Sequence, residues 1–189
     1  MISDLEVPED PKTTYCVSNF HAGTESAAHA IVPECMIMVN YRSKDPQILA
    51  ELGEKIHSAI QEACEIENKR AGSPGAVSWF YETVCDVPAG SQQMHLPLIE
   101  SAAECIRTMG MDPYFTDGGC CNSNIAIGCG IPAITIGSMY RAPGFTEPTM
   151  FHTTDEHFYT DKSFLTVKMT LLMVLANAGV YGVIEPLSK

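Results

Sequence analysis

The chain has 189 residues, of which 46% are hydrophobic and 18% charged, and its formal net charge is −12. This composition is ordinary for a water-soluble globular protein, and the length allows one large domain or two small ones. The sequence argues against nucleic acid as a partner, because it contains no basic run that could neutralise phosphates.

The eight cysteines are expected to be free and mostly buried thiols in a reducing cytoplasm. The amino-terminal residues MISDLEVPEDPK are acidic and contain two prolines, which does not match the basic and apolar regions of a secretory signal. The most apolar late stretch, residues 164–175, contains Lys168 and is too short to span a bilayer, so we expect a buried helix there and no membrane partner.

Residues 13–85 predict the order strand, strand, helix, strand. The β-branched and aromatic runs that predict the strands are Thr13–Phe20, Ile37–Tyr41 and Val77–Val84. The first two strands are close enough in sequence to pair antiparallel, with a turn at His21–Thr24 between them. Pro46 indicates a helix start, and apolar residues at helical spacing predict a helix over residues 48–68. The prediction is a small antiparallel sheet with a helix on one face.

The remaining residues predict an α/β layer with few strands. A hinge is expected at Cys85–Ser91, which is rich in Pro, Gly and Ser. The predicted elements after it are a helix at Leu98–Met109, a short strand at Pro113–Phe115, a short helix at Asn122–Ile127, a strand at Ala133–Ile136 and a last helix from Ser163 to Gly179.

The stretch Asp117–Glu156 concentrates the features that are typical of an enzyme site. It contains a Gly-Gly turn, the adjacent Cys120 and Cys121, a buried strand, and a Gly/Pro-rich loop that ends at His152. A buried strand that leads into a polar loop is a common way for α/β enzymes to place reactive side chains.

Five segments in order carry a resemblance to a known family. They read TTYCVSNFHAGT, HAIVPECMIMVNYRS, CDVPAG, CCNSNIAIGCGIPAITIG and HTTDE. This order resembles the di-zinc metallopeptidases that include aminoacylases, acetylornithine deacetylase, succinyl-diaminopimelate desuccinylase, peptidase T and glutamate carboxypeptidases. The resemblance implies an α/β protein with an α+β lid: a partial ferredoxin-like lid and dimerisation domain at residues 1–86, and part of the α/β catalytic domain at residues 87–189.

The resemblance also implies roles for individual residues. His152 matches the last metal ligand of the family, and Asp155 or Glu156 would orient its imidazole. Arg42 matches the lid arginine that clamps the substrate carboxylate, for which a planar guanidinium is suited. From the residues alone, Arg42 is equally well interpreted as a surface charge at the end of a strand. Asn124 matches an asparagine near the substrate.

Four residues depart from the family pattern. His29 stands where the lid asparagine stabilises the transition state, but the sequence slightly favours a plain histidine in a turn at this position. Cys121-Asn122 replaces the usual Ser/Thr-Asp pair, and Val87 stands where arginine is common. The other metal ligands and the Glu-Glu catalytic base of the family precede the lid, so this chain corresponds to the carboxy-terminal portion.

The function implied by the resemblance is zinc-dependent hydrolysis of acyl-amino acids or small peptides, in which two zinc ions activate a water and a glutamate takes its proton. Catalytic zinc needs about three protein ligands, so this chain alone is expected to be inactive and to bind no zinc tightly. Its expected protein partner is a second copy or a complementing amino-terminal half. The alternatives are a non-enzymatic dimerisation or interaction module, and a thiol- or metal-responsive protein that uses Cys120, Cys121 and His152.

Overall fold

The computed structural model describes residues 1–23, 28–29, 31–116, 119, 121–137, 150, 153–161 and 163–187. The chain divides into two compact units, the first built mainly from residues 1–91 and the second from residues 92–189. The elements in chain order are η1 (Ile2–Asp4), β1 (Thr13–Ala22), β2 (Cys35–Ser43), α1 (Pro46–Ala71), α2 (Pro97–Thr108), α3 (Ser123–Gly128) and α4 (Ser163–Ala178).

The first unit is built on an antiparallel hairpin of β1 and β2, in which Thr13 pairs with Ser43 and Ala22 pairs with Cys35. The two predicted strands and their antiparallel pairing are confirmed. Both strands are longer than predicted. β1 continues through His21 and Ala22, where a turn is predicted, and β2 extends from Cys35 to Ser43. The pairing is interrupted between Val17 and Asn19, where β1 has one residue more than its partner strand.

The boundaries of α1 follow from its capping residues, and the predicted helix is confirmed. The Asp45 side chain accepts hydrogen bonds from the backbone N–H groups of Gln47 and Ile48, and Pro46 fills the first turn. Both features satisfy or remove donors that a helix start leaves unpaired. The helix ends at Gly72, whose φ of 65° is a left-handed conformation that glycine adopts without strain.

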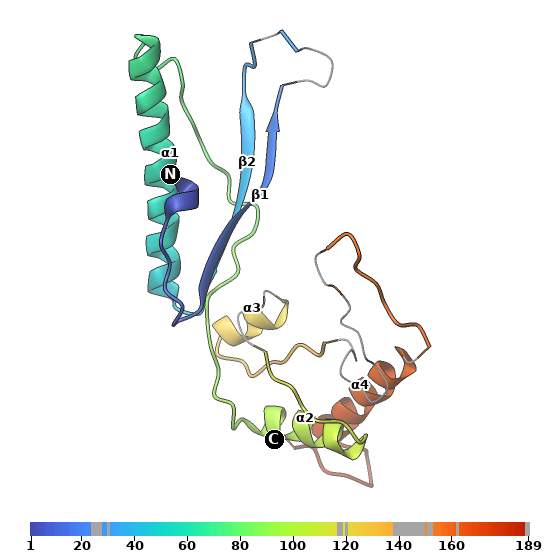
Figure 1. Cartoon of the computed structure of the whole chain (residues 1–189). Coiled ribbons are helices and arrows are strands. Elements are labelled where there is room, and N and C mark those ends of the chain that lie inside the picture. Colours follow the sequence, from blue (N-terminus) through green and yellow to red (C-terminus); the bar gives the residue numbers. More distant parts are fainter. Residues whose placement is uncertain are drawn as a thin grey trace. The chain divides into compact units, whose positions relative to one another are not determined.

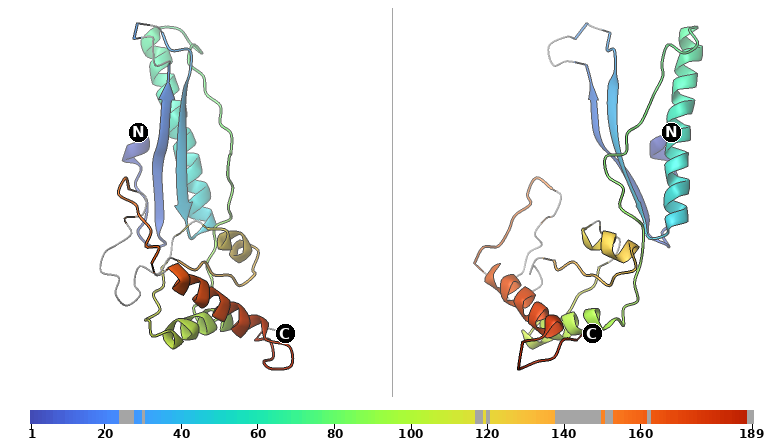
Figure 2. Two further views of the ribbon diagram at one scale, coloured as in Figure 1. Left: turned by 90° about the vertical axis from the view of Figure 1, so that its right-hand side faces the viewer. Right: turned by 180° about the vertical axis from the view of Figure 1, so that it is seen from behind.

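One face of the hairpin packs against α1, as Figure 1 and the turned views of Figure 2 show. The helix buries Leu52, Ile56 and Ala59, which are no more than 8% exposed. Gly53 allows a close approach, since a Cβ atom there would lie 3.1 Å from the Tyr41 hydroxyl. The core of this unit is therefore the interface between a helix stripe and a two-stranded sheet.

The predicted strand at Val77–Val84 is wrong, because these residues do not pair with β1 or β2. Instead, this segment lies along α1 and contacts its side chains. The Asn68 side chain exchanges two hydrogen bonds with the Val77 backbone, at 2.7 and 2.8 Å. The Trp79 indole donates to the Gln61 side chain at 2.7 Å, and the Tyr81 ring stacks on His57 at 4.2 Å between centroids. Side chains of the helix thus hold a segment whose β-branched and aromatic residues favour extended backbone.

In the second unit, α2 packs on α4. The buried core comprises Ala102, Cys105, Met111, Met169 and Met173. The helices predicted for these segments and for α3 are confirmed. In contrast to the buried Met169 and Met173, Met36 and Met38 on β2 are 51% and 39% exposed.

The strands predicted at Pro113–Phe115 and Ala133–Ile136 are not formed. Ile134 and Ile136 still pack against the core of α2 and α4. The side chain of Gln92 forms hydrogen bonds with both the N–H and the carbonyl of Ala133. These two bonds replace the pair that a neighbouring strand would make with Ala133. The protein thus combines helices with a two-stranded antiparallel sheet. In the described residues of the second unit, the β pairing consists of the isolated bridge between Val180 and Ile184.

The helix α4 buries one face only. Its exposed face carries Phe164, Val167 and Leu171, which are at least 50% exposed. The prediction of a buried helix at residues 164–175 is therefore right for one side of the helix and wrong for the other. Within the described ranges, no helix combines the length and the apolar character needed to cross a membrane.

The described cysteines are free thiols, but most of them are exposed, which corrects the expectation of burial. Cys105 is the buried exception, in the core between α2 and α4. Burial raises the pKa of the Cys105 thiol, and the negative charge of Glu104 adds to this effect. This thiol therefore stays protonated at a pH where exposed thiols begin to ionise.

The packing of α1 on the hairpin predicts a large difference between two isoleucines of the same helix. Ile56 is 3% exposed and Ile66 is 56% exposed. Ile56→Ala should lower the free energy of unfolding by about 2–5 kcal/mol, whereas Ile66→Ala should change it by about 0.5 kcal/mol or less. Urea denaturation followed by circular dichroism measures both, and equal losses would contradict the packing.

The contacts of Val77–Val84 with α1 can be followed through Trp79, the single tryptophan of the chain. Replacing His57 or Gln61 by alanine should free the indole and increase the quenching of its fluorescence by acrylamide. Gln47→Ala is the matched control, because Gln47 lies on the same helix and bonds to Glu51 instead. Unchanged quenching in both test variants would show that the segment does not lie on α1.

Candidate functional site

The face of the hairpin opposite α1 carries polar side chains. Along β2, the alternation of a strand places Asn40 and Arg42 on this face, while Ile37 and Tyr41 face the helix. The cross-strand partners on the same face are Thr14 opposite Arg42, Cys16 opposite Asn40, Asn19 opposite Met38 and His21 opposite Met36. Within this unit, the described elements leave the face exposed to solvent (Figure 2).

Arg42, the predicted carboxylate clamp, lies near the end of β2 and is exposed. Its Nε–H donates to Oδ1 of Asn40 at 2.8 Å. Because Asn40 is neutral, this bond orients the guanidinium without cancelling its charge. Asn40 was not identified from the sequence, although its position two residues before Arg42 on a strand was the signal that could have found it.

Asn124, predicted to lie near the substrate, is in the first turn of α3 and is half-buried. Its Oδ1 accepts the N–H of Cys121 at 3.0 Å, and its own N–H donates to the Cys121 carbonyl at 2.9 Å. These two bonds fix the turn that leads into α3. Ser123, its neighbour, shares a hydrogen bond of 2.7 Å with Thr135, so the helix start is tied to the segment predicted as a strand.

His152, the predicted zinc ligand, lies outside the described residues, as does Cys120. Glu156, which is predicted to orient the imidazole of His152, is exposed. Its backbone N–H donates to the Thr153 carbonyl at 3.2 Å. The next histidine was given no role from the sequence. The ring nitrogens of His157 lie 2.9 Å from the Asp155 carbonyl and 3.1 Å from the Tyr159 hydroxyl.

His29 is exposed and lies in a turn between β1 and β2. Arg42 is near the opposite end of the hairpin, because β2 begins at Cys35 and ends at Ser43 (Figure 1). The structure therefore does not bring these two predicted residues together within the first unit. Asn124 and Glu156 belong to the second unit, on α3 and on the segment before α4.

No group of three or more His, Cys, Asp or Glu side chains in the described ranges could hold a metal ion. The described residues therefore do not fit a zinc centre by themselves. The predicted ligand His152 would need partners from outside these ranges.

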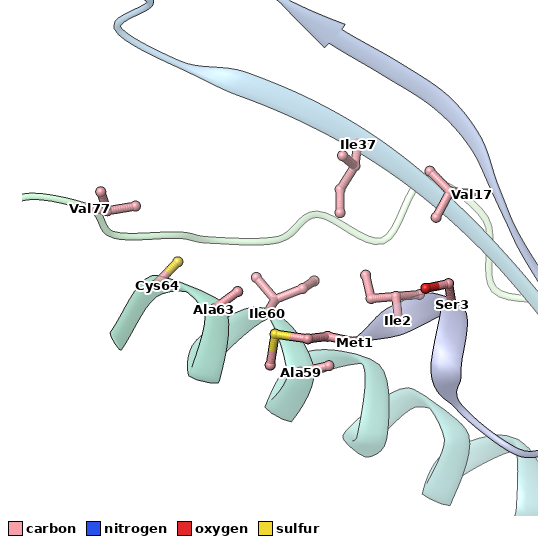
Figure 3. A pocket seen from close by; sticks show the side chains of 10 residues that line it. All are labelled: Met1, Ile2, Ser3, Val17, Ile37, Ala59, Ile60, Ala63, Cys64 and Val77. Atoms are coloured by element: carbon pink, nitrogen blue, oxygen red, sulfur yellow. The ribbon is translucent and has the colours of Figure 1, made fainter. Parts of the chain in front are cut away.

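An apolar groove of about 510 Å³ lies between α1, η1 and the hairpin (Figure 3). Val17 and Ile37 point into it from the strands, and Ala59 and Ile60 from the helix. The other lining residues are Met1, Ile2, Ser3, Ala63, Cys64 and Val77. The groove contains no carboxylate, histidine or cationic side chain, so it offers apolar contact rather than acid–base chemistry.

No protein-family model matches the chain, and no curated protein matches it either. The resemblance to di-zinc metallopeptidases therefore depends on the order of the motifs in the sequence, and the roles it implies remain predictions.

Proposed function

We propose that this chain is the carboxy-terminal part of a zinc-dependent amidohydrolase or peptidase that acts on acyl-amino acids or small peptides. The observation that carries the proposal is the order of five sequence segments, from TTYCVSNFHAGT to HTTDE. The arrangement of the first two segments as a hairpin followed by a helix is compatible with half of a lid domain.

Arg42 supports an anionic substrate. Its guanidinium is exposed on the free face of the hairpin, and its neighbour Asn40 leaves the positive charge uncompensated. An acyl-amino acid and a peptide carboxy terminus both carry a carboxylate, which a guanidinium binds through two parallel hydrogen bonds. In this proposal Arg42 binds the substrate, and Asn124 lies near it.

Zinc is the cofactor that the proposed function requires. When bound, it would supply an activated water for attack on the amide carbonyl. His152 is the one ligand that this chain would provide, with Glu156 orienting its imidazole. The remaining ligands would come from residues outside the described ranges.

The experiment reads the DNA immediately upstream of codon 1 and expresses that reading frame together with residues 1–189. We expect the frame to encode the His-x-Asp and Glu-Glu motifs, and the combined protein to hydrolyse N-acetyl-amino acids when zinc is present. Residues 1–189 alone should show no hydrolysis above the blank. His152→Ala should abolish the activity of the combined protein, because a ligand is lost.

Two results would overturn the proposal. One is an upstream sequence without either motif, combined with no hydrolysis by any assembly that contains residues 1–189. The other is zinc-dependent hydrolysis by residues 1–189 alone that is lost in His152→Ala, since the whole site would then lie within this chain. His157→Ala serves as the control for general effects of removing an imidazole from the same segment.

A second candidate function is an interaction or dimerisation module, which one observation favours. The hairpin has two strands, so each strand has one edge without a partner strand among the described residues. The segment at Val77–Val84 is also unpaired, and its Phe80 and Val84 side chains are 91% and 76% exposed. Unpaired edges and exposed apolar side chains favour the addition of another strand.

Light scattering after size exclusion, over a range of protein concentrations, tests this candidate. A module of this kind should form a dimer whose fraction rises with concentration, and Phe80→Glu should reduce that fraction by placing a charge in the contact. Val183→Glu is the control, because Val183 is 78% exposed in the second unit. A monomer at every concentration would reject the candidate.

A further inference from the structure

The arginines among the described residues differ in the charge of the side chain that accepts their hydrogen bonds. Arg70 meets Glu67 side-on, through Nε and Nη2, and Arg107 pairs with Glu104 at 3.1 Å. Arg42 is the exception among them: its Nε–H donates to the neutral Asn40, at 2.8 Å. In a chain with a net charge of −12, Arg42 thus keeps a positive charge that no described carboxylate neutralises.

The bond to Asn40 also limits how Arg42 can bind an anion. A guanidinium can present two parallel N–H groups to a carboxylate either side-on, through Nε and one Nη, or end-on, through both Nη atoms. Arg70 shows the side-on arrangement with Glu67. For Arg42, the Nε–H is already used by Asn40, so the end-on arrangement is the one that remains.

A second hydrogen-bond donor lies on the strand opposite Arg42. Thr14 is the direct cross-strand partner of Arg42, so its side chain emerges on the same face of the hairpin. Opposite residues of an antiparallel pair have Cβ atoms about 5 Å apart. The Thr14 hydroxyl therefore lies on the same face of the hairpin as the guanidinium of Arg42, and in the inference below it donates to an anion bound there.

We infer that Arg42, Thr14 and Asn40 form a carboxylate-binding subsite, in which Asn40 is a positioning residue that makes Arg42 bind end-on. The inference rests on the proposed function, since it describes how the substrate carboxylate would be held. It adds two residues, Asn40 and Thr14, and a binding geometry. The ligand is a carboxylate.

The test uses the 189-residue chain labelled with nitrogen-15 and N-acetylglycine as the probe. N-acetylglycine should shift the Nη signals of Arg42 and leave its Nε signal almost unchanged. N-acetylglycinamide, which has the same shape without the charge, should shift neither. Asn40→Ala should move the Nε signal before any ligand is added, because its acceptor is lost.

The affinity for N-acetylglycine, measured in the same titrations, tests the contributions of Asn40 and Thr14 separately. Asn40→Ala and Thr14→Val should each weaken N-acetylglycine binding about threefold to tenfold, the range expected for losing one hydrogen bond. Thr14→Ser keeps the hydroxyl and should bind like the wild type. Asn19→Ala is the matched control, because Asn19 lies on the same face opposite Met38. Backbone spectra of each variant report whether the hairpin is intact.

The outcomes distinguish this inference from the proposed function. If the wild type does not bind N-acetylglycine, or if Arg42→Ala binds it equally well, the role of Arg42 in the proposed function fails together with the subsite. If binding needs Arg42 but is unchanged in Asn40→Ala and Thr14→Val, the subsite alone is wrong. A ligand-induced shift of Nε as large as that of Nη would also overturn the end-on geometry.

Discussion

The first unit depends on the contact between the apolar stripe of α1 and one face of the β1–β2 hairpin. A two-stranded hairpin is marginally stable by itself in water, because it buries too little apolar surface. Leu52, Ile56 and Ala59 supply the missing cover, and Gly53 lets the helix approach Tyr41 closely. Because one face is enough for this packing, the other face is left available for polar side chains such as Arg42.

Local signals in the sequence were sufficient for the helices and the hairpin. Asp45 and Pro46 mark the start of α1, and Gly72 marks its end, because capping depends on residues adjacent in the chain. The strands predicted at Val77–Val84 and Ala133–Ile136 failed for a different reason. Their residues favour extended backbone, but a strand also needs a partner, and the partner is set by contacts between distant parts of the chain.

The candidate site was predictable to a similar degree. The position of Arg42 near a strand end followed from the sequence, and alternation along β2 would also have indicated Asn40 as its neighbour. The hydrogen bond between them could not be predicted, because it depends on the rotamers of two exposed side chains. The exposure of most thiols was missed for a physical reason as well: cysteine is usually buried, but a two-stranded sheet has too little interior to enclose Cys16 and Cys35.

The extra residue in β1, at Ser18, has a consequence for which side chains accompany Arg42. In a strand without interruption, Thr14, Cys16, Ser18 and Phe20 would all share one face. The inserted residue exchanges the two faces for the rest of the strand, so that His21 joins Thr14 and Cys16 while Phe20 turns to the side of α1. A single amino acid thereby assigns an imidazole, in place of a phenyl ring, to the solvent-facing surface of the sheet.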